Sequence, residues 1–337
     1  MKQVNIVVAG ASRGETLPID RECLQKIAGV SPQLKVTDAS ELLAREQRGD
    51  LSAKAELDAI LNSADVLFAL HLPQYLLQRA PHLKWIQMMA AGVEMALSKD
   101  IVESPVVMTN VSGIHVTTIG EHILCVILMF SRQMPLYLKL QQEKKWERSF
   151  PVLLRGKTAG IVGLGNIGRE VARLAKCFGM NVIAIRHSAT EGARARHVDK
   201  LIPPQKLPEL LTKSDFVILT LPSTAETTHL IGEKELHLMK PTAFIINIAR
   251  GNIIDEEALI NALLEKRIAG AGLDVFGQEP LPAEDRLWNT PNVILTPHIS
   301  GNMADYFARC TDIFCENLER FLAGKRLLHI VDKKRGY

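Results

Sequence analysis

Residues 158–188 read Thr158-Ala-Gly-Ile-Val-Gly163-Leu-Gly165-Asn-Ile-Gly168-Arg-Glu-Val-Ala-Arg-Leu-Ala-Lys-Cys-Phe-Gly-Met-Asn-Val182-Ile-Ala-Ile-Arg186-His-Ser188. A short apolar run leads into three glycines with the spacing Gly-x-Gly-x-x-Gly. A helical pattern follows the glycines, and a second apolar run, 182–185, comes after it. A strand, a glycine turn, a helix and a strand within about thirty residues form the unit that binds dinucleotides. We therefore predict a dinucleotide-binding domain around this stretch.

Each glycine of the turn has its own predicted task. Gly163 allows the tight turn, Gly165 lets the backbone approach a pyrophosphate, and Gly168 lets the helix pack close to the strand. Asn166 and Ile167 open the helix, whose N-terminal N–H groups attract phosphates, so we include both among the cofactor-binding residues. An ordinary turn that contains glycines is the alternative interpretation.

The end of the second strand indicates which dinucleotide is bound. Units that bind NAD usually carry Asp or Glu there, to accept hydrogen bonds from the ribose 2′-hydroxyl. This chain carries Arg186, followed by His187 and Ser188. An arginine cannot accept a hydrogen bond, but it pairs with a 2′-phosphate. We predict that these three residues favour NADP(H); the alternative is a solvated arginine in a protein that also accepts NAD(H).

The composition excludes several classes of protein. The 337 residues suit two domains, and a hydrophobic content of 47% is ordinary for a globular core. Lys and Arg number 40 against 37 Asp and Glu, and this near balance gives no case for binding nucleic acid or a membrane surface. The five cysteines lack metal-site or redox spacing, and no apolar stretch is long enough to span a bilayer. The first residues begin a strand-like run directly, so we expect no signal peptide. We expect reduced thiols, no metal and a cytoplasmic location.

The first 108 residues alternate strand-like apolar runs with helical patterns, which is typical of a parallel sheet covered on both faces. They lack a glycine fingerprint, so we expect a separate, smaller α/β domain. The turn Met89-Ala90-Ala91-Gly92-Val93-Glu94 precedes a predicted helix, and the N–H groups of such a turn can bind an anion. Ala91 and Gly92 are therefore candidates for binding a substrate carboxylate, with a plain turn as the alternative.

Helical patterns at 117–132 and 135–146 precede the glycine unit. Their surplus of apolar positions suggests a homodimer contact, although burial within one chain would explain it too. Another helical pattern, within 301–325, is expected to cross back and complete the first domain.

Four further strand-like runs follow the glycine unit, at 216–221, 243–248, 269–275 and 293–296. Ligands of a parallel sheet bind outside the carboxyl ends of its strands. The residues at or just after these ends are Pro222 and Thr227, Ile248 and Arg250, Asp274, and His298. We expect these residues, together with the glycine turn, to surround the cofactor and the substrate. Asp274 could instead only cap the next segment.

Arg250, Glu279 and His298 together suit one reaction. An arginine can hold a 2-oxo acid through its carboxylate and carbonyl oxygens. A histidine can give a proton to the carbonyl oxygen as hydride reaches the carbon, and take it back in reverse. A glutamate bonded to that histidine would stabilise the imidazolium. The set predicts reversible reduction of a 2-oxo acid, although singly the three could be a surface arginine, a loop acid and a core histidine.

Four motifs resemble those of the D-isomer-specific 2-hydroxyacid dehydrogenase family. They are Gly163-Leu-Gly-Asn-Ile-Gly168, Ile246-Asn-Ile-Ala-Arg250-Gly251-Asn-Ile-Ile-Asp255, Gly272-Leu-Asp274-Val-Phe276-x-x-Glu279-Pro280, and Thr296-Pro-His298-Ile-Ser-Gly301. The resemblance implies that Arg250 binds substrate and that His298 is the acid/base with Glu279 as its partner. It also implies that Asp274 contacts the nicotinamide carboxamide and that the backbone at Ala91–Gly92 binds the substrate carboxylate.

The same resemblance implies a fold and an assembly. The expected fold is α/β, with two parallel-sheet domains that are Rossmann-like and flavodoxin-like. The nucleotide-binding domain (109–299) is inserted in the substrate-binding domain (1–108 and 300–337), and the protein is a homodimer.

A looser motif, Tyr137-x-x-x-Gln141 with Trp146, is similar to the branch that contains glyoxylate and hydroxypyruvate reductases. It implies a D-2-hydroxyacid dehydrogenase that acts on a small 2-oxo acid. A short phosphoglycerate dehydrogenase and a cofactor-sensing, corepressor-like interaction protein stay open as alternatives.

Overall fold

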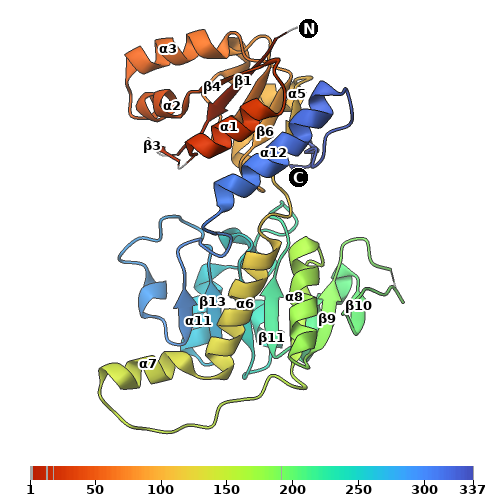
Figure 1. Ribbon diagram of the computed structural model, residues 1–337. Helices are drawn as coiled ribbons and strands as arrows, with labels where there is room; N and C mark the ends of the chain where they lie inside the picture. The colour runs from red at the N-terminus through yellow and green to blue at the C-terminus, as the bar shows by residue number, and fades with distance from the viewer. Residues whose placement is uncertain (1–2, 13, 18, 191, 337) are drawn as a thin grey trace. The chain divides into compact units, whose positions relative to one another are not determined.

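The computed structural model describes residues 3–12, 14–17, 19–190 and 192–336. The chain forms two compact units (Figure 1): unit 1 is Met1–Ile114 with Met303–Tyr337, and unit 2 is His115–Asn302. Each unit contains a parallel sheet, and unit 2 is inserted in unit 1, so the predicted fold class is confirmed. The predicted segment boundaries lie a few residues before those of the two units, and their roles in binding substrate and nucleotide stay predictions.

Unit 1 is built on a parallel sheet with the strand order β4-β1-β5-β6-β7. The strands are β1 (Val4–Ala9), β4 (Leu34–Asp38), β5 (Val66–Ala69), β6 (Trp85–Met88) and β7 (Val107–Thr109). Counted along the chain, the order is 2-1-3-4-5, that of flavodoxin-like sheets. Every residue of β5 and β6 is buried, as expected for strands covered on both faces.

Helices and short elements complete unit 1. They are β2 (Ala11–Ser12), β3 (Glu15–Thr16), α1 (Arg21–Gly29), α2 (Ser40–Gln47), α3 (Leu51–Leu61), α4 (Leu76–Arg79), the 3-10 turn η1 (Glu94–Ala96), α5 (Lys99–Glu103) and α12 (Tyr306–Leu322). Figure 1 shows α12 beside α1 on one side of the sheet. Phe314 of α12 stacks on Phe68 with ring centroids 4.4 Å apart, and it lies 5.1 Å from Trp85. The segment after the insertion therefore helps to form the core of unit 1, in agreement with the helix predicted within 301–325.

Unit 2 has the strand order β10-β9-β8-β11-β12-β13-β14, all parallel. The strands are β8 (Thr158–Val162), β9 (Asn181–Ile185), β10 (Lys200–Ile202), β11 (Phe216–Leu219), β12 (Phe244–Asn247), β13 (Gly270–Leu273) and β14 (Val293–Leu295). Counted along the chain, the order is 3-2-1-4-5-6-7, the Rossmann order extended by one strand. The direction of winding changes between β8 and β11, which places the switch point beside the glycine turn.

Helices cover both faces of this sheet. They are α6 (Val116–Ser131), α7 (Met134–Gln142), α8 (Asn166–Cys177), α9 (Leu207–Lys213), α10 (Glu233–Leu238) and α11 (Glu256–Leu264), with 3-10 turns η2 (Pro204–Lys206), η3 (Gly251–Ile253) and η4 (Arg286–Asn289). Buried side chains of α6 and α8 pack on one face, and those of α9, α10 and α11 pack on the other.

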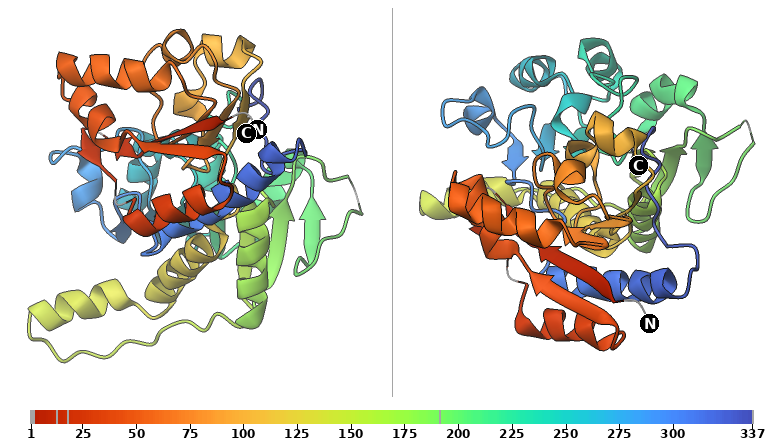
Figure 2. Two further views of the ribbon diagram at one scale, coloured as in Figure 1. Left: turned by 45° about the horizontal axis from the view of Figure 1, so that its top comes forward. Right: turned by 90° about the horizontal axis from the view of Figure 1, so that it is seen from above.

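The helix predicted at 135–146 ends earlier, at Gln142. Lys144 has a φ of +55°, which is incompatible with a right-handed helix. The residues 143–145 are all charged, so they provide no apolar side chain that could pack a further helical turn against the core. Trp146 and Phe150 are more than 90% exposed. Figure 2 shows α7 and the following segment extending away from the rest of unit 2.

Among the helices of the described residues, no single one is long and apolar enough to cross a bilayer. The helices α6 and α7 meet that length and composition only when they are taken together, across a bend of 65°.

Candidate functional site

The candidate residues of unit 2 follow strands that end side by side. The register pairs Val162 with Leu219, Leu219 with Asn247, Asn247 with Leu273, and Leu273 with Leu295. The glycine turn, Arg250, Asp274 and His298 come after these strand ends. They therefore share the carboxyl edge of the sheet, where parallel sheets bind their ligands.

The three glycines of the turn have different surroundings. A Cβ on Gly163, whose φ is +108°, would lie 2.8 Å from the backbone carbonyl of Thr220. A Cβ on Gly168 would lie 2.3 Å from the carbonyl oxygen of Gly163, whereas a Cβ on Gly165 would meet no atom within 4 Å. Packing within the chain therefore requires glycine at 163 and 168 but not at 165. Space for a pyrophosphate against the backbone would explain Gly165.

The start of α8 offers unpaired donors beside this space. In the described part of the chain, no atom accepts a hydrogen bond from the N–H groups of Gly165, Asn166 or Ile167, and no side chain caps the helix. Gly165 and Asn166 are exposed. An uncapped helix N-terminus of this kind suits a phosphate group. The turn and the helix thus fit a dinucleotide.

Arg186 follows β9 next to the glycine turn. The N–H groups of Gly163 and Leu164 donate to the carbonyl oxygen of Ile185 at 3.2 and 2.9 Å, which ties the two segments together. Arg186, His187 and Ser188 are exposed. The structure thus places a cation and two polar side chains, without a carboxylate among them, after the strand whose end contacts the glycine turn.

The loop after β11 is ordered by Thr227. Its Oγ1 accepts from the N–H of Thr224 at 2.7 Å and donates to the carbonyl oxygen of Pro222 at 2.8 Å. Ile248 is buried just after β12. Both loops lie at the carboxyl edge, and the contact of Pro222, Thr227 and Ile248 with a cofactor stays a prediction.

Asp274 holds the loop that carries His298. Its Oδ1 accepts from Thr296 Oγ1 at 2.6 Å and from the N–H of Ile299 at 2.9 Å, and its Oδ2 accepts from the N–H of Ser300 at 2.9 Å. Its side chain is buried. These contacts are to the loop at 296–300 and not to the segment that directly follows Asp274, and a contact between Asp274 and a nicotinamide stays a prediction.

His298 and Glu279 are in direct contact. The distance from His298 Nδ1 to Glu279 Oε2 is 2.7 Å, and Glu279 Oε1 accepts from the N–H of Phe276 at 3.0 Å. The φ of His298 is +54°, an uncommon conformation for a residue with a side chain, and one that often marks functional sites. With Nδ1 held by the carboxylate, the half-exposed ring has Nε2 available for proton transfer.

Arg250 lies in a turn that packs against the segment preceding Glu279. Asn247 Nδ2 donates to the carbonyl oxygen of Arg250 at 2.9 Å, and Arg250 Nη1 donates to the carbonyl oxygen of Ala249 at 2.7 Å. A Cβ on Gly251 would lie 1.9 Å from the carbonyl carbon of Phe276. The close approach of these two backbones fixes the turn of Arg250 relative to the segment of Glu279.

Ala91 and Gly92 lie in unit 1, after β6. The prediction of a helix directly after them is wrong, because only the three-residue turn η1 forms there and α5 begins separately at Lys99. In the part of the chain that the structure describes, the N–H groups of Ala91 and Gly92 donate no hydrogen bond. They are therefore suitable donors for an anion, although without the dipole of a long helix, and their role stays a prediction.

Three polar side chains that shape unit 2 were not singled out as site residues from the sequence: Thr220, Asn247 and Thr296. Thr220 Oγ1 donates to the carbonyl oxygen of Gly163 at 2.6 Å. Each lies at or just after the end of a strand, and this position is the feature of the sequence from which they could have been predicted. No group of three His, Cys, Asp or Glu side chains in the described residues could hold a metal ion.

Known proteins are similar to this chain in sequence and in fold. The family pattern for the NAD binding domain of D-isomer specific 2-hydroxyacid dehydrogenases matches residues 124–300. A glyoxylate reductase of Thermococcus litoralis is 35% identical over 300 residues, which cover 85% of this chain and 87% of that protein.

Two solved structures are similar over nearly the whole chain. A D-isomer specific 2-hydroxyacid dehydrogenase family protein from Aeromonas salmonicida has a TM-score of 0.83 and 30% identity, covering 98% of this chain and 100% of its own. The NADPH-dependent glyoxylate/hydroxypyruvate reductase of Sinorhizobium meliloti, solved with NADP and sulfate, has a TM-score of 0.81 and 26% identity, covering 99% and 100%.

Proposed function

Since this chain belongs to the D-isomer-specific 2-hydroxyacid dehydrogenase family and is an NAD(P)-dependent oxidoreductase, we propose that it reduces a small 2-oxo acid of the glyoxylate or hydroxypyruvate type. The observation that carries the proposal is the contact of 2.7 Å between His298 and Glu279 at the sheet edge shared with the glycine turn. The relatives named glyoxylate reductase support a small substrate.

The proposed roles follow from the chemistry of each side chain. A dinucleotide held at the glycine turn and the start of α8 would supply the hydride for the carbonyl carbon. The guanidinium of Arg250 holds the substrate through charge-assisted hydrogen bonds to its carboxylate and carbonyl oxygen. The imidazolium of His298 donates its Nε2 proton to the carbonyl oxygen, which becomes the hydroxyl, and takes a proton back in reverse. Glu279 fixes the ring orientation and stabilises the imidazolium, and Asp274 holds the loop in place.

The proposal includes a preference for NADP(H) over NAD(H). Arg186 is exposed directly after β9 and next to the glycine turn, where an acidic residue would select NAD. A guanidinium there attracts a 2′-phosphate, and it has no acceptor for a 2′-hydroxyl. The NADPH-dependent relative from Sinorhizobium meliloti agrees with this preference.

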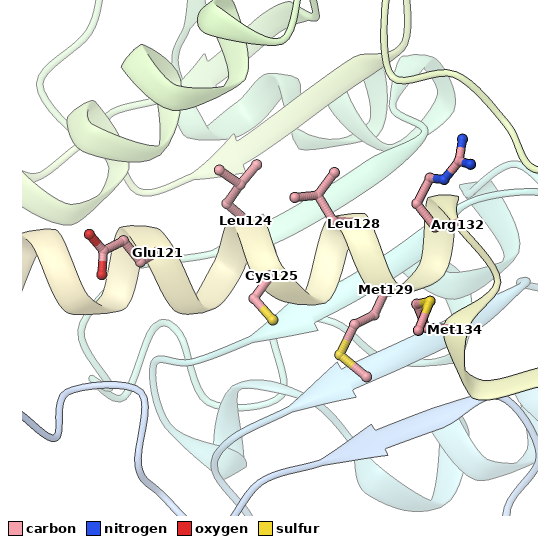
Figure 3. Close-up of a pocket in the computed structure, with 7 residues that line it drawn as sticks. All are labelled: Glu121, Leu124, Cys125, Leu128, Met129, Arg132 and Met134. Atoms are coloured by element: carbon pink, nitrogen blue, oxygen red, sulfur yellow. The ribbon is translucent and has the colours of Figure 1, made fainter. Parts of the chain in front are cut away.

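We further propose that two copies of the chain associate through α6 and α7. Figure 3 shows side chains that project from α6 and from the start of α7 and line a groove of about 470 Å³. The lining residues are Glu121, Leu124, Cys125, Leu128, Met129, Arg132 and Met134. Leu136 and Leu138 of α7 are also more than 40% exposed. Exposed apolar side chains that gather on one part of a surface favour association. Sedimentation of wild type and of Leu128→Glu tests it, and a wild-type monomer would contradict it.

The proposed reaction is tested by the oxidation of NADPH with the purified protein. The panel is glyoxylate, hydroxypyruvate, pyruvate, phenylpyruvate and 2-oxoisocaproate, repeated with NADH. Turnover of glyoxylate or hydroxypyruvate, faster with NADPH, is the expected result. A separate assay supplies 3-phosphoglycerate with NADP+ or NAD+; oxidation there, without turnover of any acid of the panel, would instead identify a short phosphoglycerate dehydrogenase. Tight binding of NADPH without turnover of any acid would favour a cofactor-sensing protein.

A further inference from the structure

Three successive carbonyl oxygens of the loop after β6 accept hydrogen bonds. The pairs are the Tyr306 hydroxyl with Met89, the Val111 N–H with Ala90 at 3.3 Å, and the Asn110 Nδ2 with Ala91 at 2.7 Å. Tyr306 is the first residue of α12, and the other two donors follow β7. The loop is therefore held by two segments that are distant from it in sequence.

The bonds to Ala90 and Ala91 set the direction of the N–H groups in the same peptide units. A peptide unit is planar and trans, so its N–H points away from its C=O. Holding the carbonyl of Ala90 fixes the N–H of Ala91, and holding the carbonyl of Ala91 fixes the N–H of Gly92. These two N–H groups donate no hydrogen bond in the described part of the chain. The loop thus presents two oriented donors, which suits an anion.

The side chain of Asn110 is well suited to this task. It is buried, its Oδ1 accepts from the N–H of Ser112 at 3.1 Å, and its Nδ2 donates to Ala91. The bond from Ser112 determines which end of the amide faces the loop. A donor on the carbonyl of Ala91 also polarises that peptide unit, which makes the N–H of Gly92 a better donor.

Tyr306 fixes the start of the same loop. Its hydroxyl donates to the carbonyl oxygen of Met89, two residues before Ala91. Burial raises the pKa of this phenol, so it stays a neutral donor over the whole working range of pH. A phenylalanine would keep the ring, and with it the edge contact to Phe307, while removing the bond.

We propose that Asn110 is a positioning residue that orients the N–H of Gly92 toward the carboxylate of the substrate, and that Tyr306 supports it by holding the start of the same loop. This inference rests on the proposed function for the identity of the anion. It assigns the recognition of the carboxylate to two side chains that need not touch it.

Steady-state kinetics with glyoxylate separates positioning from simple stabilisation. Asn110→Ala should raise the KM for glyoxylate by about tenfold, as expected when one charge-assisted hydrogen bond is misdirected, and Tyr306→Phe should raise it less. Asn110→Asp should be worse than Asn110→Ala, because it places an oxygen against the carbonyl of Ala91. The KM for NADPH should not change. Asn5→Ala is the matched control, since its Nδ2 donates to the carbonyl of Ser63 at 2.9 Å elsewhere in unit 1.

A binding measurement keeps the inference testable without turnover. In protein labelled with ¹⁵N-glycine, and with the Gly92 signal assigned through Gly92→Ala, oxalate should shift that signal in wild type. The shift should need about tenfold more oxalate in Asn110→Ala. A folded Asn110→Ala with unchanged KM and unchanged oxalate affinity would overturn the inference. So would a wild-type Gly92 signal that does not respond to oxalate. Wild-type protein that binds oxalate at Gly92 but reduces no 2-oxo acid would overturn the proposed reaction and leave the positioning role intact.

Discussion

Alanine at position 165 should separate cofactor binding from stability. Gly165 has a φ of −83°, which alanine adopts readily, and a Cβ there would meet no atom within 4 Å. Alanine also lowers the entropy of the unfolded chain, so Gly165→Ala should change the free energy of unfolding by less than about 1 kcal/mol, in the stabilising direction. In the proposed cofactor site, the added methyl would nonetheless occupy the space of the pyrophosphate. The Kd for NADPH should rise by about 10- to 100-fold, or about 1.4–2.8 kcal/mol.

The neighbouring glycines provide the contrast. Alanine at 163 would combine a φ of +108° with a Cβ 2.8 Å from the backbone of Thr220. Alanine at 168 would bring a Cβ to 2.3 Å from a carbonyl oxygen. Strain and overpacking of this kind cost about 1–3 kcal/mol or more. Both variants should therefore lose stability as well as cofactor affinity.

Two assays on each variant are sufficient. Urea denaturation without ligand gives the free energy of unfolding, and NADPH fluorescence titration gives the Kd. The reasoning would be refuted if Gly165→Ala destabilised the free protein as much as Gly168→Ala, or if it bound NADPH as tightly as wild type.

Three other substitutions test the remaining assignments. Arg186→Glu should lower the ratio of kcat/KM for NADPH over NADH by about 100-fold, because a carboxylate repels a 2′-phosphate and accepts from a 2′-hydroxyl; an unchanged ratio would remove Arg186 from cofactor recognition. His298→Asn should lower kcat by about 10²- to 10⁴-fold while the Kd of NADPH stays nearly constant, and near-normal turnover would exclude His298 as the acid/base. Burial lowers the pKa of His115 in the folded chain below the usual histidine pKa of about 6.5. As the pH falls below about 6.5, the unfolded chain therefore takes up a proton more readily than the folded chain, and the free energy of unfolding decreases. His115→Asn should therefore weaken the loss of stability between about pH 7 and pH 5 in urea titrations, whereas an unchanged loss would assign it to other groups.

Much of unit 2 could be predicted because its determinants are local. The glycine spacing, the apolar runs and the periodicity of α8 all lie within residues 158–188, and the strand order follows from the Rossmann topology. Glu279 and His298 were predicted as partners from residues that are separated in sequence, and the structure brings their side chains to 2.7 Å. Motifs at strand ends carry such information because the sheet aligns those ends.

What could not be predicted depends on contacts between distant segments. The strands β7 and β10 were not predicted; each has three residues, and so short an apolar run is ambiguous by itself. The turn after Gly92 has the small residues of a helix start, but the helix does not continue. The hydrogen bond from Asn110 to Ala91 joins two loops, and the sequence of neither loop indicates that it contacts the other. Asp274 has no local sign that both of its oxygens are bonded to residues 296–300.

The insertion of one unit within the other has a consequence for synthesis on the ribosome. Residues 115–302 are continuous, so they contain their whole core once they have emerged. Phe68 and Trp85 cannot pack against Phe314 at first, because Phe314 emerges from the ribosome only after all of unit 2. Domains made at the N-terminus usually fold first. Here the sheet that is made first is expected to be completed last, and its exposed aromatic side chains need protection until α12 has left the exit tunnel.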